Sequence, residues 1–128
     1  MRELTVWLLC GIGLYASAFM ARKAWRDARG QLDEPSVVQV PAARLFFGIP
    51  NAVLGIAFYA AVAATIVPAE SNLAVRIALR AAVAFATSVS CVLAYDLLAR
   101  TKRSCPYCWT AHATNVALLL ASARLWMK

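Results

Sequence analysis

Two cysteines near the C-terminus, Cys105 and Cys108, are separated by Pro106 and Tyr107 and open an uncharged run that continues to Ala123. A Cys-x-x-Cys pair in the first turn of a helix lies at the positive end of the backbone dipole, which favours thiolate over thiol and therefore disulfide exchange. The apolar run that follows approaches the length of a membrane-spanning helix. The spacing predicts a redox-active dithiol where a membrane helix begins.

Four groups on this predicted helix could react or form hydrogen bonds, and they fall on one face. Cys105, Cys108, His112 and Asn115 stand at positions i, i+3, i+7 and i+10, which is one stripe of a helix with 3.6 residues per turn. Polar side chains at membrane depth are costly and usually face a bundle interior or a cavity. We therefore expect the dithiol, the imidazole and the amide to face inward.

A second apolar stretch, from Leu45 to Pro68, carries groups that could meet this face. They recur at helical spacing and are Asn51, Gly55, Phe58 and Tyr59. Gly55 would allow a helix or a flat ring to approach closely. Two amides and one imidazole could hydrogen-bond the carbonyls of a planar quinone, with Phe58, Tyr59 or Trp109 as the stacking surface. Since a dithiol and an oxidised quinone are a natural redox couple, the pattern favours thiol–quinone chemistry.

The composition predicts a membrane protein with one domain, residues 1–128. Hydrophobic residues make up 62% of the 128 residues, which is too apolar for an ordinary soluble protein. A membrane-spanning helix needs about 20 mostly apolar residues. Four stretches approach that length, namely Leu4–Ala21, Leu45–Pro68, Leu73–Leu98 and Cys108–Met127. We therefore expect an all-α bundle of four transmembrane helices.

The first half of the chain adds three expectations. The first apolar stretch lacks a sizeable basic flank and a persuasive cleavage site, so it is expected to be a retained helix. The segment Gln31–Ala43, which contains Pro35 and Pro41, is expected to form a short cap on the bundle mouth between the first two helices. The second helix is expected to begin near Leu45 and to kink at Pro50, because proline removes a backbone hydrogen bond.

The motifs in both halves of the chain resemble those of the vitamin K epoxide reductase family, especially its bacterial members. The resemblance covers the whole four-helix core. The matching residues are Phe47-Gly48-Ile49-Pro50-Asn51-Ala52-Val53-Leu54-Gly55 with Phe58-Tyr59, and Cys105-Pro106-Tyr107-Cys108 with Asn115.

This resemblance implies a quinone pocket inside the bundle, with a ubiquinone or menaquinone type of cofactor and with Cys105 and Cys108 as the catalytic pair. In the family the second cysteine of the motif lies beside the quinone, so Cys108 is the expected adduct-forming thiolate, and Cys105 exchanges with an incoming thiol. Asn51 matches an asparagine that hydrogen-bonds one quinone carbonyl. His112 occupies the position of a residue, often tyrosine, that binds the other end of the ring. An imidazole there could donate a hydrogen bond or deliver a proton.

One departure from the family pattern concerns the electron donor. Family members generally carry a second cysteine pair in the first loop, whereas Asp27–Leu45 contains no cysteine and Pro35 stands where the second loop cysteine would be. We expect a separate thioredoxin-like protein, or a small thiol, to deliver electrons directly at Cys105. The alternative is a non-catalytic bundle that serves as a structural or assembly subunit of a larger membrane complex.

The charge distribution bears on partners and orientation. The net charge is +7, but the 13 Lys and Arg residues are spread over the turns. This distribution excludes a nucleic-acid partner and is typical of basic residues that flank membrane-spanning helices. Basic residues mark the cytoplasmic side, and the loops on the Cys-x-x-Cys side hold eight of them against five on the other. Asp27, Asp33 and Glu34 share that side, and the family usually faces its cysteines away from the cytoplasm. We therefore expect a cell-membrane protein whose Cys-x-x-Cys end faces the periplasm or the outside.

Several residues have simpler interpretations. The cysteine pair could be half of a zinc site, but the single histidine lies on the same helix and no second pair exists, so no metal is expected. Cys10 and Cys91 are expected to be small buried hydrophobic residues, with a resolving thiol as the alternative for Cys91. Asn115 is expected to be structural. Asp96 and Arg100 are expected to form a surface ion pair of little energetic value.

Overall fold

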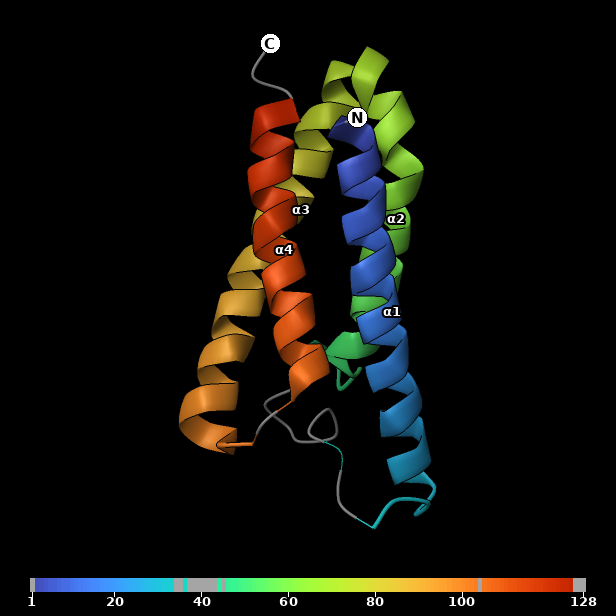
Figure 1. The fold of residues 1–128 in the computed structure, drawn as a ribbon, viewed down its shortest axis with the longest axis vertical. Coiled ribbons are helices and arrows are strands. Elements are labelled where there is room, and N and C mark those ends of the chain that lie inside the picture. The colour runs from blue at the N-terminus through green and yellow to red at the C-terminus, as the bar shows by residue number, and fades with distance from the viewer. Residues whose placement is uncertain (1, 34–35, 37–43, 45, 104, 126–128) are drawn as a thin grey trace.

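The computed structural model describes residues 2–33, 36, 44, 46–103 and 105–125. Within these residues the chain forms four long helices that lie side by side and run alternately up and down (Figure 1). A five-residue π-helix continues the third helix without a break. The elements are α1 (Arg2–Ala28), α2 (Asn51–Ser71), α3 (Leu73–Asp96), η3 (Leu97–Thr101) and α4 (Pro106–Leu125).

Three of these helical segments are long and apolar enough to cross a membrane. They are Glu3–Ala28, Asn51–Ser71 and the continuous segment Leu73–Thr101. Large apolar side chains such as Leu8, Val92 and Leu120 are exposed, which fits a lipid solvent. The predicted all-helical membrane protein is therefore confirmed. α4 has 20 residues but carries polar side chains in its first half, so a fourth span stays a prediction.

The second helix begins later than the sequence analysis predicted. α2 starts at Asn51, and Pro50 is its N-cap residue, so Pro50 precedes the helix and does not kink it. Proline is suited to a helix start, because it has no N–H to leave unpaired. A tight turn comes before it, closed by a 2.9 Å hydrogen bond from the Ile49 N–H to the Phe46 carbonyl. Phe47 and Gly48 adopt positive φ angles of 52° and 71° in this turn.

Most of the predicted cap segment lies outside the described residues, including Pro35 and Pro41, and so does Leu45, the expected start of the second helix. Ser36 is described and is buried. Its backbone N–H donates to Oδ2 of Asp27 at 2.7 Å. Asp27 is in the last turn of α1, so this bond ties the chain after α1 back to the end of that helix.

A short turn joins α2 to α3 at the opposite end of the bundle. Asn72 is the N-cap residue of α3, and its side-chain Oδ1 accepts from the N–H groups of Ala74 at 2.9 Å and Val75 at 3.2 Å. Such a cap satisfies donors that have no partner inside the helix. Pro68 lies inside α2, close to its end.

The four helices pack through two clusters of buried side chains. α1 packs on α2 and α4, and α3 packs on the same two helices. One cluster holds bulky residues in the half of the bundle that contains the α2–α3 turn, including Val62, Leu79 and Leu118. The other cluster lies near the cysteine pair and consists mostly of alanines, with Met20 among them. Small residues let helices approach closely. Figure 1 shows that α3 diverges from α1 toward the end of the bundle where α4 begins.

Candidate functional site

The cysteine pair lies where α4 begins. Cys105 immediately precedes the helix and Cys108 is in its first turn, and the two form a disulfide with 5.2 Å between their Cα atoms. The Cys108 N–H donates to Cys105 Sγ at 3.2 Å, and the Trp109 N–H donates to the Cys105 carbonyl at 3.1 Å. Both cysteines are partly buried. The cysteine pair thus lies at a helix N-terminus, as predicted.

A cavity of about 510 Å³ lies among the four helices beside this pair. This volume is in the range of small-molecule sites, which are mostly apolar with a few placed polar groups. Six of the seven residues that the sequence analysis assigned to the site line it, namely Asn51, Gly55, Phe58, Tyr59, Cys108 and His112. Cys105, the seventh, is not among the described lining residues. Cys108 is therefore the cysteine of the pair that lines the cavity.

Two polar atoms in the cavity wall are buried without a hydrogen-bond partner among the described residues. They are Nδ2 of Asn51, from the first turn of α2, and Nδ1 of His112, from α4. Buried polar groups in proteins are nearly always paired, so these two atoms point to a ligand that supplies the partners. A quinone carbonyl would accept a hydrogen bond from the Asn51 amide, and the imidazole could serve the other end of a flat ring. The residues present fit a quinone.

The model of the Vitamin K epoxide reductase family matches residues 4–123. The chain belongs to this family. A search of curated proteins gives no significant match. Membership indicates a membrane thiol oxidoreductase of a family that is linked to quinones in general. The Cys105–Cys108 pair is close enough to form the disulfide that thiol oxidation requires.

In this family member the deep end of the cavity is closed by a hydrogen-bonded network. The Tyr59 hydroxyl is 2.7 Å from Oδ1 of Asn115 and 3.1 Å from the Ala111 carbonyl. The Asn115 amide in turn donates to the hydroxyl of Ser90 on α3. These bonds join α2, α3 and α4, which agrees with the structural role predicted for Asn115. Tyr59 is 2% exposed and lines the cavity, and its hydroxyl is already paired.

Gly55, the glycine of α2, allows α1 to approach closely. A Cβ atom added at Gly55 would lie 2.6 Å from Oγ of Ser17 on α1. Ser17 is itself buried and lines the cavity. Of the two approaches that the sequence left open for Gly55, the structure shows that of a helix.

The stacking surface is narrower than the sequence suggested. Phe58 lines the cavity, edge-on to Tyr59 with 5.2 Å between ring centroids. Trp109 is 38% exposed and is absent from the described lining. Its ring lies edge-on to His112 at 6.0 Å. Trp109 is one residue off the inward stripe of α4, and this explains why it points away from the cavity.

Two predictions about α3 are wrong. Asp96 is not a surface residue, because it is 7% exposed and lines the cavity, although it does pair with Arg100 at 3.2 Å. Cys91 is exposed rather than buried, and it does not belong to the described cavity wall. Cys10 is buried in the core as predicted. Asp96 shares a helix face with Val89 and Leu93 at intervals of three to four residues, but only the structure shows that this face lines the cavity.

Proposed function

We propose that this protein is a quinone-dependent thiol-disulfide oxidoreductase of the membrane, which oxidises a dithiol at Cys105 and Cys108 and reduces a ubiquinone or menaquinone type of quinone. One observation carries the proposal. Cys108, Asn51 and His112 line the same cavity, and Nδ2 of Asn51 and Nδ1 of His112 are buried without a hydrogen-bond partner among the described residues. A redox sulfur and two hydrogen-bonding groups around a mostly apolar space suit a flat ring with a carbonyl at each end.

The roles of the residues follow from their places. Asn51 Nδ2 donates to one carbonyl oxygen, and His112 binds the oxygen at the other end of the ring and can deliver a proton to it. Cys108 presents its sulfur to the cavity, while Cys105 closes the disulfide from behind. In closing, the two thiols release two electrons and two protons, and a bound quinone accepts two electrons and two protons as it becomes the hydroquinone. Phe58 and the ring of Tyr59 flank the reacting plane.

Electrons enter at Cys105 in this proposal. Cys105 precedes α4 at the mouth of the bundle and is partly buried. Because the first loop has no cysteine, a thiol of a separate thioredoxin-like protein, or a small thiol, attacks the disulfide at Cys105 and forms a mixed disulfide. A second thiol of the donor then attacks this mixed disulfide, which releases Cys105, restores the dithiol and leaves the donor oxidised to its own disulfide. In the first attack the leaving sulfur is Cys108, which the helix N-terminus favours as the thiolate.

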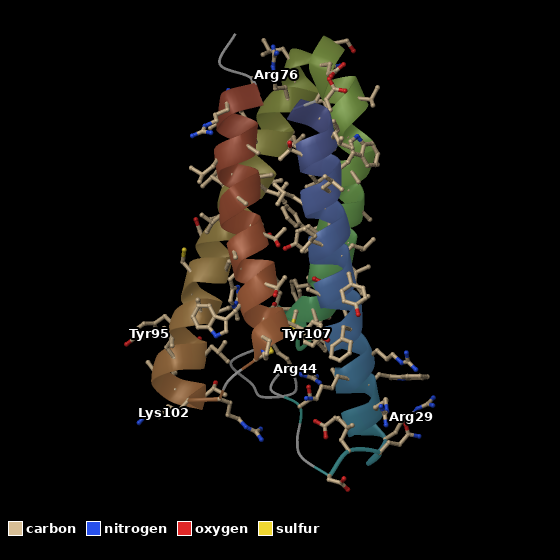
Figure 2. All side chains as sticks on the ribbon, viewed as in Figure 1. Arg29, Arg44, Arg76, Tyr95, Lys102 and Tyr107 are labelled. Carbon is tan, nitrogen blue, oxygen red and sulfur yellow. A yellow bond between two sulfur atoms is a disulfide. The ribbon has the colours of Figure 1, made fainter. Side chains whose placement is uncertain are left out.

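We also propose that this end of the bundle faces the periplasm or the outside. Figure 2 places Arg29, Arg44 and Lys102 toward the end of the bundle where Tyr107 lies, and Arg76 at the opposite end. Asp27 and Asp33 lie in the chain beside the basic residues of the cysteine end and offset part of their charge. Labelling of Cys105 in intact cells by a membrane-impermeant maleimide, after mild reduction, tests this orientation. Labelling of Cys105 only after permeabilisation would instead place this end of the bundle in the cytoplasm.

The decisive experiment is the anaerobic addition of a short-chain quinone to the purified, reduced protein, with the number of free thiols followed over time. We expect two thiols to be lost for each quinone reduced. Cys108→Ala should abolish the reaction and leave the fold intact. Cys91→Ala is the matched control, because Cys91 is a free cysteine outside the described cavity wall, and it should react like the unmodified protein.

A non-catalytic role in a larger membrane complex is the second candidate, and the missing loop cysteines favour it. In that case the thiol count stays constant after quinone is added, and the protein co-purifies with stoichiometric partners. Thiols that remain unreactive toward both quinone and maleimide would replace the first proposal with the second.

A further inference from the structure

Asp96 is the one carboxylate among the described residues that line the cavity. It is the last residue of α3, is 7% exposed, and is followed directly by the π-helix η3. Leu97 and Thr101 of η3 line the cavity as well. Short π-helical turns are frequent at functional sites, and an ionisable side chain in a membrane helix indicates a functional role unless a partner explains it.

The partner of Asp96 does not explain its burial. Arg100 Nε is 3.2 Å from Asp96 Oδ1, but the Arg100 side chain is 72% exposed whereas that of Asp96 is 9% exposed. An i, i+4 pair with a solvent-exposed partner contributes little to stability. A carboxylate needed only for this pair could lie on the surface beside Arg100. Its place in the cavity wall therefore calls for another reason.

Reduction of a quinone needs two protons at the oxygens of the ring. Few groups in the cavity can supply them. The titratable groups that face it with Asp96 are Cys108 and His112 from α4 and Tyr59 from α2, while the α1 lining residues, Ser17 and Met20, do not titrate. The Tyr59 hydroxyl is held by Asn115 and Ala111, and Cys108 reacts as the thiolate. His112 and Asp96 remain.

We propose that Asp96 relays one of the two protons to the quinone as it is reduced, an inference that rests on the function proposed above. Its carboxylate, which pairs with Arg100, first takes up a proton from water and then donates it to a ring oxygen. The dithiol loses two electrons and two protons in forming the Cys105–Cys108 disulfide. The two electrons pass to the quinone, His112 protonates one oxygen and Asp96 the other. Asp96 and His112 each obtain the proton that they donate from water at the mouth of the bundle, and the two thiol protons return to the same water, so that protons and electrons balance.

The test is single-turnover reduction of a short-chain ubiquinone by the pre-reduced protein in detergent, with hydroquinone formation followed by absorbance in H2O and in D2O. Asp96→Asn keeps the shape of the side chain but cannot donate an acidic proton. We expect its rate constant to fall about 100-fold, the usual contribution of a general acid, while the Kd for the quinone stays within about twofold. Asp96→Glu restores a carboxyl and should recover most of the rate.

Arg100→Gln is the matched control, because it breaks the ion pair and leaves the carboxyl in place. A rate close to that of the unmodified protein, with the solvent isotope effect retained, is expected. Equal slowing in Arg100→Gln and Asp96→Asn would show a structural pair and overturn the proposal, as would an Asp96→Asn rate that is unchanged. An unmodified protein that reduces no quinone would instead overturn the proposed function, and with it this inference.

Discussion

Cys108 Sγ lies 3.3 Å from Met20 Sδ, so the sulfur that faces the cavity rests on α1 as well as on its own helix. The neighbouring residue makes a second contact with α1. The ring of Tyr107 is stacked on Phe19 with 3.8 Å between centroids and 17° between planes. Two successive positions of the Cys-x-x-Cys turn are therefore held against α1, which fixes where the sulfur stands relative to the cavity.

Shortening Met20 should loosen this turn. Met20 is 8% exposed and packs among the small residues near the cysteine pair. Met20→Ala is expected to lower the free energy of unfolding by about 2–5 kcal/mol, the usual cost of removing a buried methionine side chain, and to slow quinone reduction. Thermal unfolding in detergent measures the first effect. Met20→Leu preserves the volume and should cost less than about 1.5 kcal/mol, so equal losses in both variants would contradict a packing role.

Removing the Tyr59 hydroxyl should affect stability more than quinone binding. In Tyr59→Phe the oxygen of the Asn115 side chain loses its donor, and an unsatisfied buried acceptor costs about 1–3 kcal/mol. The ring that lines the cavity is unchanged, so the Kd for quinone should shift little. Tyr95→Phe is the control, because Tyr95 is 64% exposed and its variant should unfold like the unmodified protein. A Tyr59→Phe variant that folds normally but binds no quinone would mean that the hydroxyl contacts the ligand directly.

Removing the amide of Asn51 should affect quinone binding more than stability. Its Nδ2 atom has no partner among the described residues, so Asn51→Ala removes no intramolecular bond there but deprives a quinone of its donor. We expect the Kd for quinone to rise about tenfold, equivalent to roughly 1.4 kcal/mol, with little loss of stability. Asn72→Ala is the matched control, since this asparagine caps α3 and its loss should cost about 1 kcal/mol of stability without changing the Kd. Isothermal titration and thermal unfolding separate the two effects.

The helix period explains which site residues could be predicted from the sequence. Cys108 and His112 stand four residues apart on α4, and the structure places both in the cavity wall, because a helix of 3.6 residues per turn fixes their common face. The same rule placed Asn51 and Gly55 together on α2. The start of that helix at Asn51 was missed, although Gly48 and Pro50 were visible signals of a turn followed by a helix N-terminus.

The inward face of α3 could not be predicted in this way. In a lipid solvent apolar side chains are equally favourable on both faces of a helix, so the pattern of hydrophobic residues does not indicate which face is buried. Cys91 therefore turned out exposed and Asp96 buried. Only the packing of α3 on α2 and α4 decides this, and it depends on all three helices together.

The close approach of α1 and α2 can be tested at Gly55. A Cβ atom there would lie 2.6 Å from Oγ and 3.3 Å from Cβ of Ser17, so Gly55→Ala should cost about 1–3 kcal/mol through overpacking. At Gly11 a Cβ atom meets nothing within 4 Å, and Gly11→Ala should be neutral or stabilising by up to about 1 kcal/mol. Because the nearest clash is with the hydroxyl, Ser17→Ala combined with Gly55→Ala should recover part of the loss, which a double-mutant cycle of thermal unfolding would measure. Strict additivity of the two substitutions would show that Ser17 is not what confines this position to glycine.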